Sequence, residues 1–189
     1  MQIGGRLNEL RRRAGMTLEA LAAATGFTRG YLSKIENAKK IPPIGSLQRI
    51  AQALHADLAG FFQSEPSDAA DEHVSLVRVS ERRSVVRGGT AFGYDYVSLA
   101  YKIRNKHIEP FIFTFPADIN KDVSFEHEGE EVLFLLSGRV EFEIGGKTWS
   151  LETGDTLFFD SSLPHRGRSI GGEARALVVI YRPDSKARP

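Results

Sequence analysis

The sequence contains no cysteine among its 189 residues, so disulfide bonds and thiolate metal sites are excluded. It also has no apolar run that approaches the roughly 18 residues needed to span a bilayer as a helix. The N-terminus does not develop the apolar segment of a signal peptide, because Arg6 and Glu9 interrupt it. From these absences we expect a cytoplasmic protein that does not contact a membrane.

A large net charge is also lacking, because the formal total is only +1. That total hides a difference between the two ends of the chain. Residues 1–62 carry nine basic and four acidic residues, a net charge of +5, whereas the remaining residues carry sixteen basic and twenty acidic residues, a net charge of −4. A basic segment joined to an acidic body is the electrostatic footprint of a nucleic-acid-binding module.

Within the basic segment, residues 17–37 have the pattern of two short helices joined by a tight turn. Thr17 and Thr28 stand where a side-chain oxygen can cap a helix N-terminus, and Gly26 supplies the turn. The outward positions of the second helix are small, polar or cationic, which suits a helix that enters the major groove of DNA. The predicted DNA-binding residues are Thr17, Thr28, Arg29, Gly30, Ser33, Lys34, Asn37, Lys39 and Lys40.

Residues 3–62 resemble the helix-turn-helix domain of the Xre and lambda-repressor class, from RLNELRRRAG through SKIENAKKIPP to SLQRIAQAL. The resemblance implies that Arg11 of the first helix pairs with Glu36 in a structural role. The sequence departs from the class at Leu18, where a glutamine usually contacts the DNA backbone. A helical cap without DNA function is the alternative, and the positive charge of this segment disfavours it.

The composition changes after residue 62. Residues 63–73 include proline, serine and four acidic residues but no apolar side chain larger than alanine, which is the composition of a linker. Beyond this segment, short β-rich runs alternate with glycine turns, which favours a sandwich or barrel over a parallel sheet. The Gly145-Gly146 pair predicts a tight hairpin. The expected strand runs are VSLVRV, FGYDYVSLAYKI, PFIFTF, EVLFLLSG, RVEFEIGG, KTWSL, DTLFFD and ARALVVIY.

We therefore expect an α+β protein in two domains. Residues 1–62 form an all-α helix-turn-helix bundle of four to five helices, with a fourth helix at 46–54 and a short closing helix near residue 62. Residues 63–73 form the acidic linker. Residues 74–185 form an all-β domain, a small jelly-roll barrel that binds the effector and forms the dimer.

Three residues of the β-rich part could hold a divalent metal. His127 and Glu131 lie on either side of a turn, and His165 follows Pro164 later in the chain. Two imidazoles and one carboxylate that converge at a barrel mouth would suit Fe(II), Mn(II), Ni(II) or Zn(II). From spacing alone, incidental surface positions are the alternative.

The FEHEGEEVLFLLSG segment resembles the first cupin motif and GDTLFFDSSLPHRGR the second, over about residues 108–182. Cupins commonly hold their metal with three histidines and a glutamate. The resemblance implies a metal-binding role for His127, Glu131 and His165, with Phe125 in place of the first histidine. Either these residues hold a metal with open positions, or the site is a relic and the barrel holds an organic ligand or nothing. No cofactor is required for the main hypothesis.

The barrel interior is the predicted effector pocket. Tyrosine hydroxyls and a guanidinium could orient a small anionic ligand there, and apolar residues would line the rest. The predicted pocket residues are Tyr94, Tyr96, Tyr101, Arg104, Phe113, Phe125 and Leu133. We also expect Leu135, Phe142 and Phe158 to face the interior, although such residues often form plain barrel core.

Two functions follow. The first is a transcriptional regulator with no catalytic residues, which binds a double-stranded DNA operator as a homodimer and responds to a small-molecule effector in its cupin domain. The second is a mononuclear non-haem iron enzyme, because the layout also resembles the hydroxypropylphosphonate epoxidases. Those enzymes bring a lysine from the helical head into the active site, whereas this chain has Ala14-Gly15-Met16 there. The first function is favoured, because the cations lie on the recognition helix.

Overall fold

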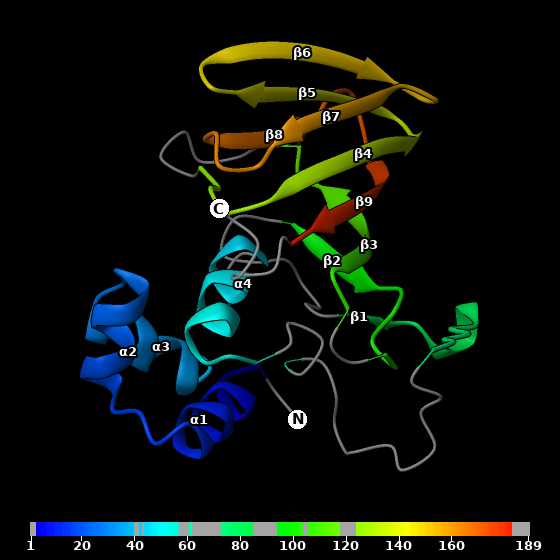
Figure 1. The fold of residues 1–189 in the computed structure, drawn as a ribbon. Coiled ribbons are helices and arrows are strands. Elements are labelled where there is room, and N and C mark those ends of the chain that lie inside the picture. The colour runs from blue at the N-terminus through cyan, green and yellow to red at the C-terminus, as the bar shows by residue number, and fades with distance from the viewer. Residues whose placement is uncertain are drawn as a thin grey trace, which may run out of the picture.

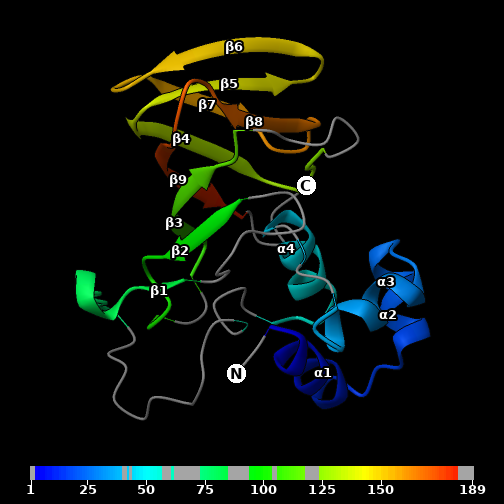
Figure 2. The ribbon, with the colours of Figure 1, turned by 180° about the vertical axis from the view of Figure 1, so that it is seen from behind.

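The computed structural model describes residues 3–39, 42, 44–56, 61, 73–84, 94–103, 106–117 and 124–182. Helices gather at one end of the molecule and strands at the other, as Figures 1 and 2 show from opposite sides. Most of the expected linker and closing helix lies outside the described residues, as do Lys40 and Arg104. No described helix is long and apolar enough to cross a membrane.

The head, residues 3–56, contains four α-helices within its described part. They are α1 (Ile3–Arg13), α2 (Leu18–Thr25), α3 (Arg29–Glu36) and α4 (Ile44–Ala53). The Thr17 hydroxyl caps α2 by accepting a hydrogen bond from the Ala20 N–H at 3.0 Å. Thr28 caps α3 in the same way through the Tyr31 N–H at 3.1 Å. Gly26 ends α2 with a φ of 69°, in the left-handed region that favours glycine. The predicted caps and turn are confirmed.

The apolar faces of these helices pack into one core. A close approach of α1 to the end of α3 is part of this packing, because a Cβ added at Gly4 would lie 2.2 Å from the Ile35 carbonyl oxygen. Any larger side chain at Gly4 would therefore push α1 away from the recognition helix. The buried core residues of the head are Leu7, Leu21, Leu32, Ile35, Leu47, Ile50, Ala51, Leu54 and Phe61.

The β-domain, residues 83–181, folds into two antiparallel sheets. Its described strands are β1 (Arg83–Ser84), β2 (Asp95–Ser98), β3 (Ile108–Phe115), β4 (Glu130–Ser137), β5 (Arg139–Ile144), β6 (Lys147–Glu152), β7 (Thr156–Asp160), β8 (His165–Ser169) and β9 (Ala174–Tyr181). One sheet has the order β1-β2-β3-β9-β4-β7 and the other the order β6-β5-β8. The hairpin at Gly145-Gly146 joins β5 to β6 as predicted. The two-domain α+β fold is confirmed.

One expected strand is absent, and one observed strand lies outside the expected strand runs. Residues 74–78 form no strand, and Val79–Glu81 is a short 3-10 helix. Val74 and Leu76 are 68% and 61% exposed, so this apolar run pairs with no sheet. Conversely, His165–Ser169 forms strand β8 although it contains no β-branched residue. Its pairing with β5 creates a strand that the local composition does not indicate.

Candidate functional site

Helix α3 buries Leu32 and Ile35 and turns its polar side outward. Lys34 is exposed and forms no ion pair with any described residue. Arg29 lies 2.5 Å from Glu19 through its Nε atom, and the two side chains are 68% and 65% exposed. Exposed pairs of this kind contribute about 0–1 kcal/mol, so Arg29 can exchange Glu19 for another anion at little cost. Of the other predicted DNA-binding positions, Thr17, Thr28, Gly30, Asn37 and Lys39 are exposed and Ser33 is half-buried.

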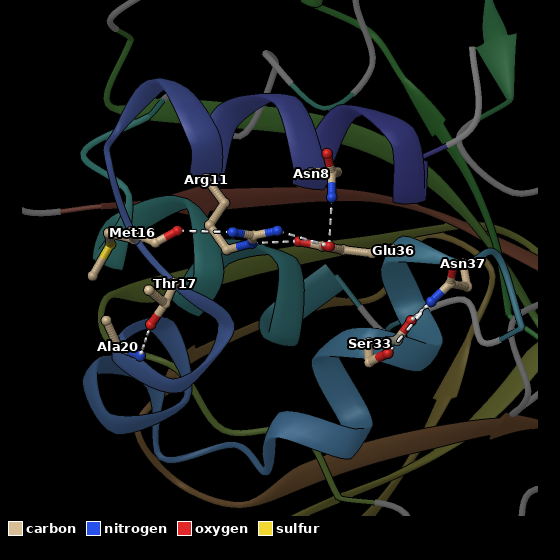
Figure 3. A network of polar contacts seen from close by, with 8 residues as sticks. All are labelled: Asn8, Arg11, Met16, Thr17, Ala20, Ser33, Glu36 and Asn37. Carbon is tan, nitrogen blue, oxygen red and sulfur yellow. Dashed lines mark hydrogen bonds and ion pairs between the residues drawn. The ribbon is translucent and has the colours of Figure 1, made fainter.

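Asn37 also has a role inside the head. Its Nδ2 donates to the Ser33 carbonyl oxygen at 2.8 Å and lies 3.3 Å from the Ser33 hydroxyl, as Figure 3 shows. The Ser33 carbonyl also accepts from the Asn37 backbone N–H at 3.0 Å, so the side chain adds a second bond to this acceptor at the end of α3. The bond fixes the position of the Asn37 amide beside the exposed face of the helix.

A buried ion pair fastens α1 to the end of α3. Arg11 donates to both oxygens of Glu36, through Nε at 2.6 Å and Nη2 at 3.0 Å, and through Nη1 to the Met16 carbonyl at 2.8 Å (Figure 3). Asn8 adds a third bond to Glu36 at 2.7 Å. Burial raises the pKa of Glu36, but the bonds from Arg11 and Asn8 outweigh burial and leave this pKa below its ordinary value. The predicted pairing of Arg11 with Glu36 is confirmed.

The three candidate metal ligands converge in the β-domain. Glu131 lies in β4 of the six-stranded sheet, His165 begins β8 of the other sheet, and His127 precedes β4. The candidate ligand atoms all lie within 4.8 Å of one another. His127 Nε2 is 2.6 Å and His165 Nε2 is 3.6 Å from Glu131 Oε1, and all three side chains are at most 5% exposed. This cluster, the triad, joins the two sheets.

The triad fits a divalent metal. His165 Nδ1 lies 2.8 Å from the Leu163 carbonyl oxygen, which can only accept, so Nδ1 carries the proton and Nε2 presents its lone pair to Glu131. Burial lowers the pKa of His165, and the Glu131 carboxylate offsets only part of this, which favours the neutral ligand form. His127 Nε2 is buried without a hydrogen-bond partner. A metal would occupy that lone pair.

A small cavity in the barrel lies beside the triad. Its described lining consists of Tyr94, Tyr96, Phe113, Phe115, Phe125, Glu131, Leu133, Phe142, His165, Arg166, Gly167 and Val178. The cavity has a volume of about 20 Å³, which is room for about one water molecule. The interior is thus nearly filled by its own aromatic rings. A metal ion or a water molecule fits there without rearrangement.

Five of the seven predicted pocket residues line this cavity, namely Tyr94, Tyr96, Phe113, Phe125 and Leu133. The Tyr94 hydroxyl is engaged by the backbone, because it donates to the Gly167 carbonyl and accepts from the Gly167 N–H. Burial also raises the pKa of Tyr94, so the hydroxyl stays neutral. Tyr101 does not line the cavity: its hydroxyl donates to the Glu81 carbonyl at 3.0 Å. Arg104 lies outside the described residues.

The expectation that Phe158 faces the interior is wrong. Phe158 is 62% exposed, whereas Phe159 is buried and pairs with Glu131 across β4 and β7. Successive side chains of a strand point to opposite faces, so only one of two adjacent phenylalanines can enter the core. The LFFD segment alone does not distinguish which one enters.

A contact between the head and the β-domain was not foreseen. Gln48 Nε2 of α4 donates to the Glu128 carbonyl at 3.3 Å, and Gln52 Nε2 to the Glu128 carboxylate at 3.0 Å. Gly45 of α4 lies so close to His127 of the β-domain that a Cβ added at Gly45 would be 2.8 Å from His127 Cδ2. In Figures 1 and 2, α4 is accordingly the helix nearest the strands. No local sequence pattern signals a contact between domains.

Comparisons with known proteins support this layout. A family model described as a helix-turn-helix domain matches residues 2–60, and one described as a cupin domain matches residues 111–181. The HTH-type transcriptional regulator PuuR of Escherichia coli is 25% identical over 180 residues, which cover 95% of this chain and 94% of PuuR. The (S)-2-hydroxypropylphosphonic acid epoxidase of Streptomyces wedmorensis is 24% identical over 182 residues, which cover 92% and 91% of the two chains.

One solved structure shares the whole fold. A helix-turn-helix family transcriptional regulator from Vibrio cholerae matches with a TM-score of 0.66 over 96% of both chains, at 23% identity. The matched domains define a class of proteins in which a helix-turn-helix head precedes a cupin domain. Within that class, this chain is similar over nearly its whole length to helix-turn-helix transcriptional regulators such as PuuR.

Proposed function

We propose that this protein is a sequence-specific DNA-binding regulator that binds its operator as a homodimer and adjusts operator affinity to what its cupin domain binds. The observation that carries this proposal is the exposed cationic face of α3, which the buried Arg11–Glu36 pair holds in place. That rigid support suits a helix that must enter a groove with fixed geometry.

The exposed residues of the head have two roles in this proposal. Thr28 and Arg29, at the N-terminal end of α3, contact base edges, as the N-terminal residues of recognition helices do. Ser33, Lys34, Asn37, Lys39 and Lys40 mainly hold phosphates, which sets affinity and its salt dependence. Two heads bind half-sites that are about 34 Å apart.

The dimer forms through an apolar patch on the outer face of the six-stranded sheet. Ile108, Phe134, Phe158 and Tyr181 are 39–62% exposed there, and half-buried Val132, Leu177 and Val179 lie between them. Strand register supports one continuous surface, because Val132 is paired with both Phe158 and Val179. Monomeric proteins rarely expose large apolar patches, and a second copy would cover this one symmetrically.

Sedimentation tests this dimer surface. A Phe158→Lys variant places a charge on the most exposed of the four exposed patch residues and is expected to sediment as a monomer. Trp149→Lys, on the other sheet, changes another exposed aromatic residue, 39% exposed, and is the matched control. If both variants remain dimeric, the interface lies elsewhere.

The triad contributes to sensing in this proposal. His127, Glu131 and His165 would hold Fe(II), Mn(II), Ni(II) or Zn(II), and Phe125 leaves a coordination position without a protein ligand. A bound divalent ion would neutralise the Glu131 carboxylate and fix His127, which touches α4. His127 thereby connects the metal site to the head.

The similarity to the epoxidase of Streptomyces wedmorensis makes an enzyme the second candidate function. The phosphonic acid in the name of that enzyme is a doubly charged anion, which needs several cations around it. Among the described residues lining the barrel cavity, Arg166 is the single cation, and it already pairs with Glu143 at 2.5 Å. That shortage of cations favours the regulator.

The deciding experiment selects operator sequences from random DNA with the full-length protein and measures the metal content of the same preparation. We expect a near-palindromic consensus with half-sites about one helical turn apart. Metal-dependent turnover of a small molecule together with no sequence preference would overturn the regulator in favour of the enzyme.

A further inference from the structure

A cleft lies between α4 and the β-domain. Its described lining consists of Gln48, Arg49 and Gln52 from α4, and Glu126, His127, Glu128 and Ser162 from the β-domain. The cleft has a volume of about 340 Å³, compared with about 20 Å³ for the barrel cavity. An organic molecule of several heavy atoms therefore fits the cleft, whereas the barrel would first have to rearrange. Domain interfaces are also preferred places for ligand sites.

Two residues of opposite charge that line the cleft have no hydrogen bond or ion pair within the described part of the chain. Arg49, on α4, forms no hydrogen bond or ion pair within the described residues, and its guanidinium carbon lies 5.3 Å from the centre of the Phe27 ring. Glu126, on the β-domain, likewise has no such partner in the described part of the chain. Both residues are exposed, and they do not pair with each other. A ligand with one positive and one negative group would meet both.

We infer that this cleft binds a small zwitterion, a free α-amino acid, with its carboxylate at Arg49 and its ammonium group at Glu126. The inference rests on the proposed function, because it gives the effector a site and a chemical class. The amides of Gln48 and Gln52 supply neutral hydrogen-bonding groups along the α4 wall. A ligand with a single charge leaves the opposite cleft charge unpaired, which weakens its binding.

The position of the cleft explains how such a ligand reaches the DNA-binding head. The ligand bridges α4 to the β-domain, where Gln48 and Gln52 already bond to Glu128 at 3.3 and 3.0 Å. It stabilises the docked orientation of the head and lowers the population of others. In a dimer, that orientation sets the separation of the two recognition helices.

His127 connects the cleft to the triad. It lines the cleft, and its Nε2 lies 2.6 Å from Glu131, which lines the barrel cavity. A zwitterion in the cleft and a metal at the triad would therefore contact the same imidazole from different sides. The amino acid site nevertheless uses Arg49 and Glu126, which are not members of the triad.

Isothermal titration calorimetry on the full-length protein tests the site. Each free L-amino acid is titrated separately, and every amino acid that binds is compared with the amine that lacks its carboxylate and the acid that lacks its amino group. We expect at least one amino acid to bind, and each matched analogue to bind at least tenfold more weakly. Binding by no amino acid, or equal binding of an analogue, overturns the inference.

Charge-neutral variants locate the site. Arg49→Gln and Glu126→Gln should each weaken binding of that amino acid at least tenfold, and both positions are exposed, so folding should persist. Arg12→Gln and Glu173→Gln remove exposed charges away from the cleft lining and are the matched controls, expected to bind as the wild type does. If the controls weaken binding as much as the cleft variants, the site is not this cleft.

Operator affinity measured with and without the bound amino acid separates the site from the proposed function. Binding together with a shift in operator affinity, lost in Arg49→Gln and Glu126→Gln, supports both. Binding that leaves operator affinity unchanged keeps the site and contradicts its regulatory role. Sequence-specific DNA binding without any amino acid binding keeps the proposed function and overturns the cleft site.

Discussion

The head buries Glu36 and the β-domain buries Glu131, each beside nitrogen atoms, but these two clusters differ in how fully they are bonded. Glu36 accepts bonds from Arg11 and Asn8, and the remaining Arg11 bond goes to a backbone carbonyl. Glu131 lies just as close to His127 Nε2, at 2.6 Å, yet that nitrogen has no hydrogen-bond partner within the described residues. The first cluster is complete without a ligand, and the second is not.

That difference separates a structural pair from a ligand site. A buried polar atom without a partner costs about 1–3 kcal/mol, so a fold tolerates it where something else completes the site. The paired cluster fixes the recognition helix, whereas the triad lies in the β-domain beside α4 and could hold a metal. The two clusters should therefore differ in their contribution to stability, in their response to metal and in their dependence on pH.

The largest expected effect is the loss of the head pair. Glu36→Ala leaves Arg11 buried without its carboxylate, and we expect a loss of about 3–5 kcal/mol in the free energy of unfolding of the head, measured by urea denaturation. Glu19→Ala breaks the exposed pair with Arg29 and should cost about 0–1 kcal/mol. Equal losses in the two variants would contradict a structural role for Arg11–Glu36.

At the triad, we expect a gain in stability when a metal is added. Zn(II) or Mn(II) at a hundredfold excess over its Kd should stabilise the wild type by about 2.7 kcal/mol, seen as a rise in Tm. In Glu131→Gln this metal stabilisation should disappear, because a neutral amide replaces the carboxylate ligand of the triad. Glu130→Gln, the exposed neighbour, should keep the metal response.

Acid should affect the head pair selectively. The folded pKa of Glu36 is depressed below 4.5, so its stabilisation is complete above about that pH and is lost as the pH falls through the folded pKa. We expect the Tm of the wild type to fall between pH 5 and pH 3, and the fall to be smaller in Glu36→Gln. An identical acid profile of the two proteins would show that Glu36 does not carry this dependence.

The smallest effect concerns a single DNA contact. Lys34→Ala should weaken binding to all sequences and reduce the salt slope of operator binding by about 0.9, the amount for one phosphate contact. Fluorescence anisotropy at several salt concentrations measures the slope. Lys147→Ala, an exposed lysine in the β-domain, is the control. A changed operator preference in Lys34→Ala would instead assign it to base recognition.

Local chemistry made the head predictable from sequence. The caps at Thr17 and Thr28 depend on atoms three residues away, and Gly26 marks its turn by its own conformational freedom. The Arg11–Glu36 pair spans 25 residues, and the resemblance to a known class supplied it. Its hydrogen bonds to Met16 and Asn8 were not predicted, because they depend on how α1 packs against α3.

The β-domain was less predictable, because strands depend on partners. The VSLVRV run is apolar but forms no strand, and the choice between Phe158 and Phe159 depends on the register of β7 with β4. The convergence of the triad followed from family resemblance rather than spacing. The cleft between α4 and Glu128 was not predicted at all, because its two walls are about 80 residues apart and belong to different domains.

Operator affinity measured by anisotropy on a selected sequence, first with metal and then after chelation, tests the central claim most directly. The account predicts that the wild type binds this sequence in preference to random DNA and that its Kd changes when metal is removed. In Glu131→Gln the Kd should stay the same under both conditions. The account would be contradicted if the wild type showed no sequence preference. It would also be contradicted if the Kd of the wild type did not change when metal is removed and equalled that of Glu131→Gln.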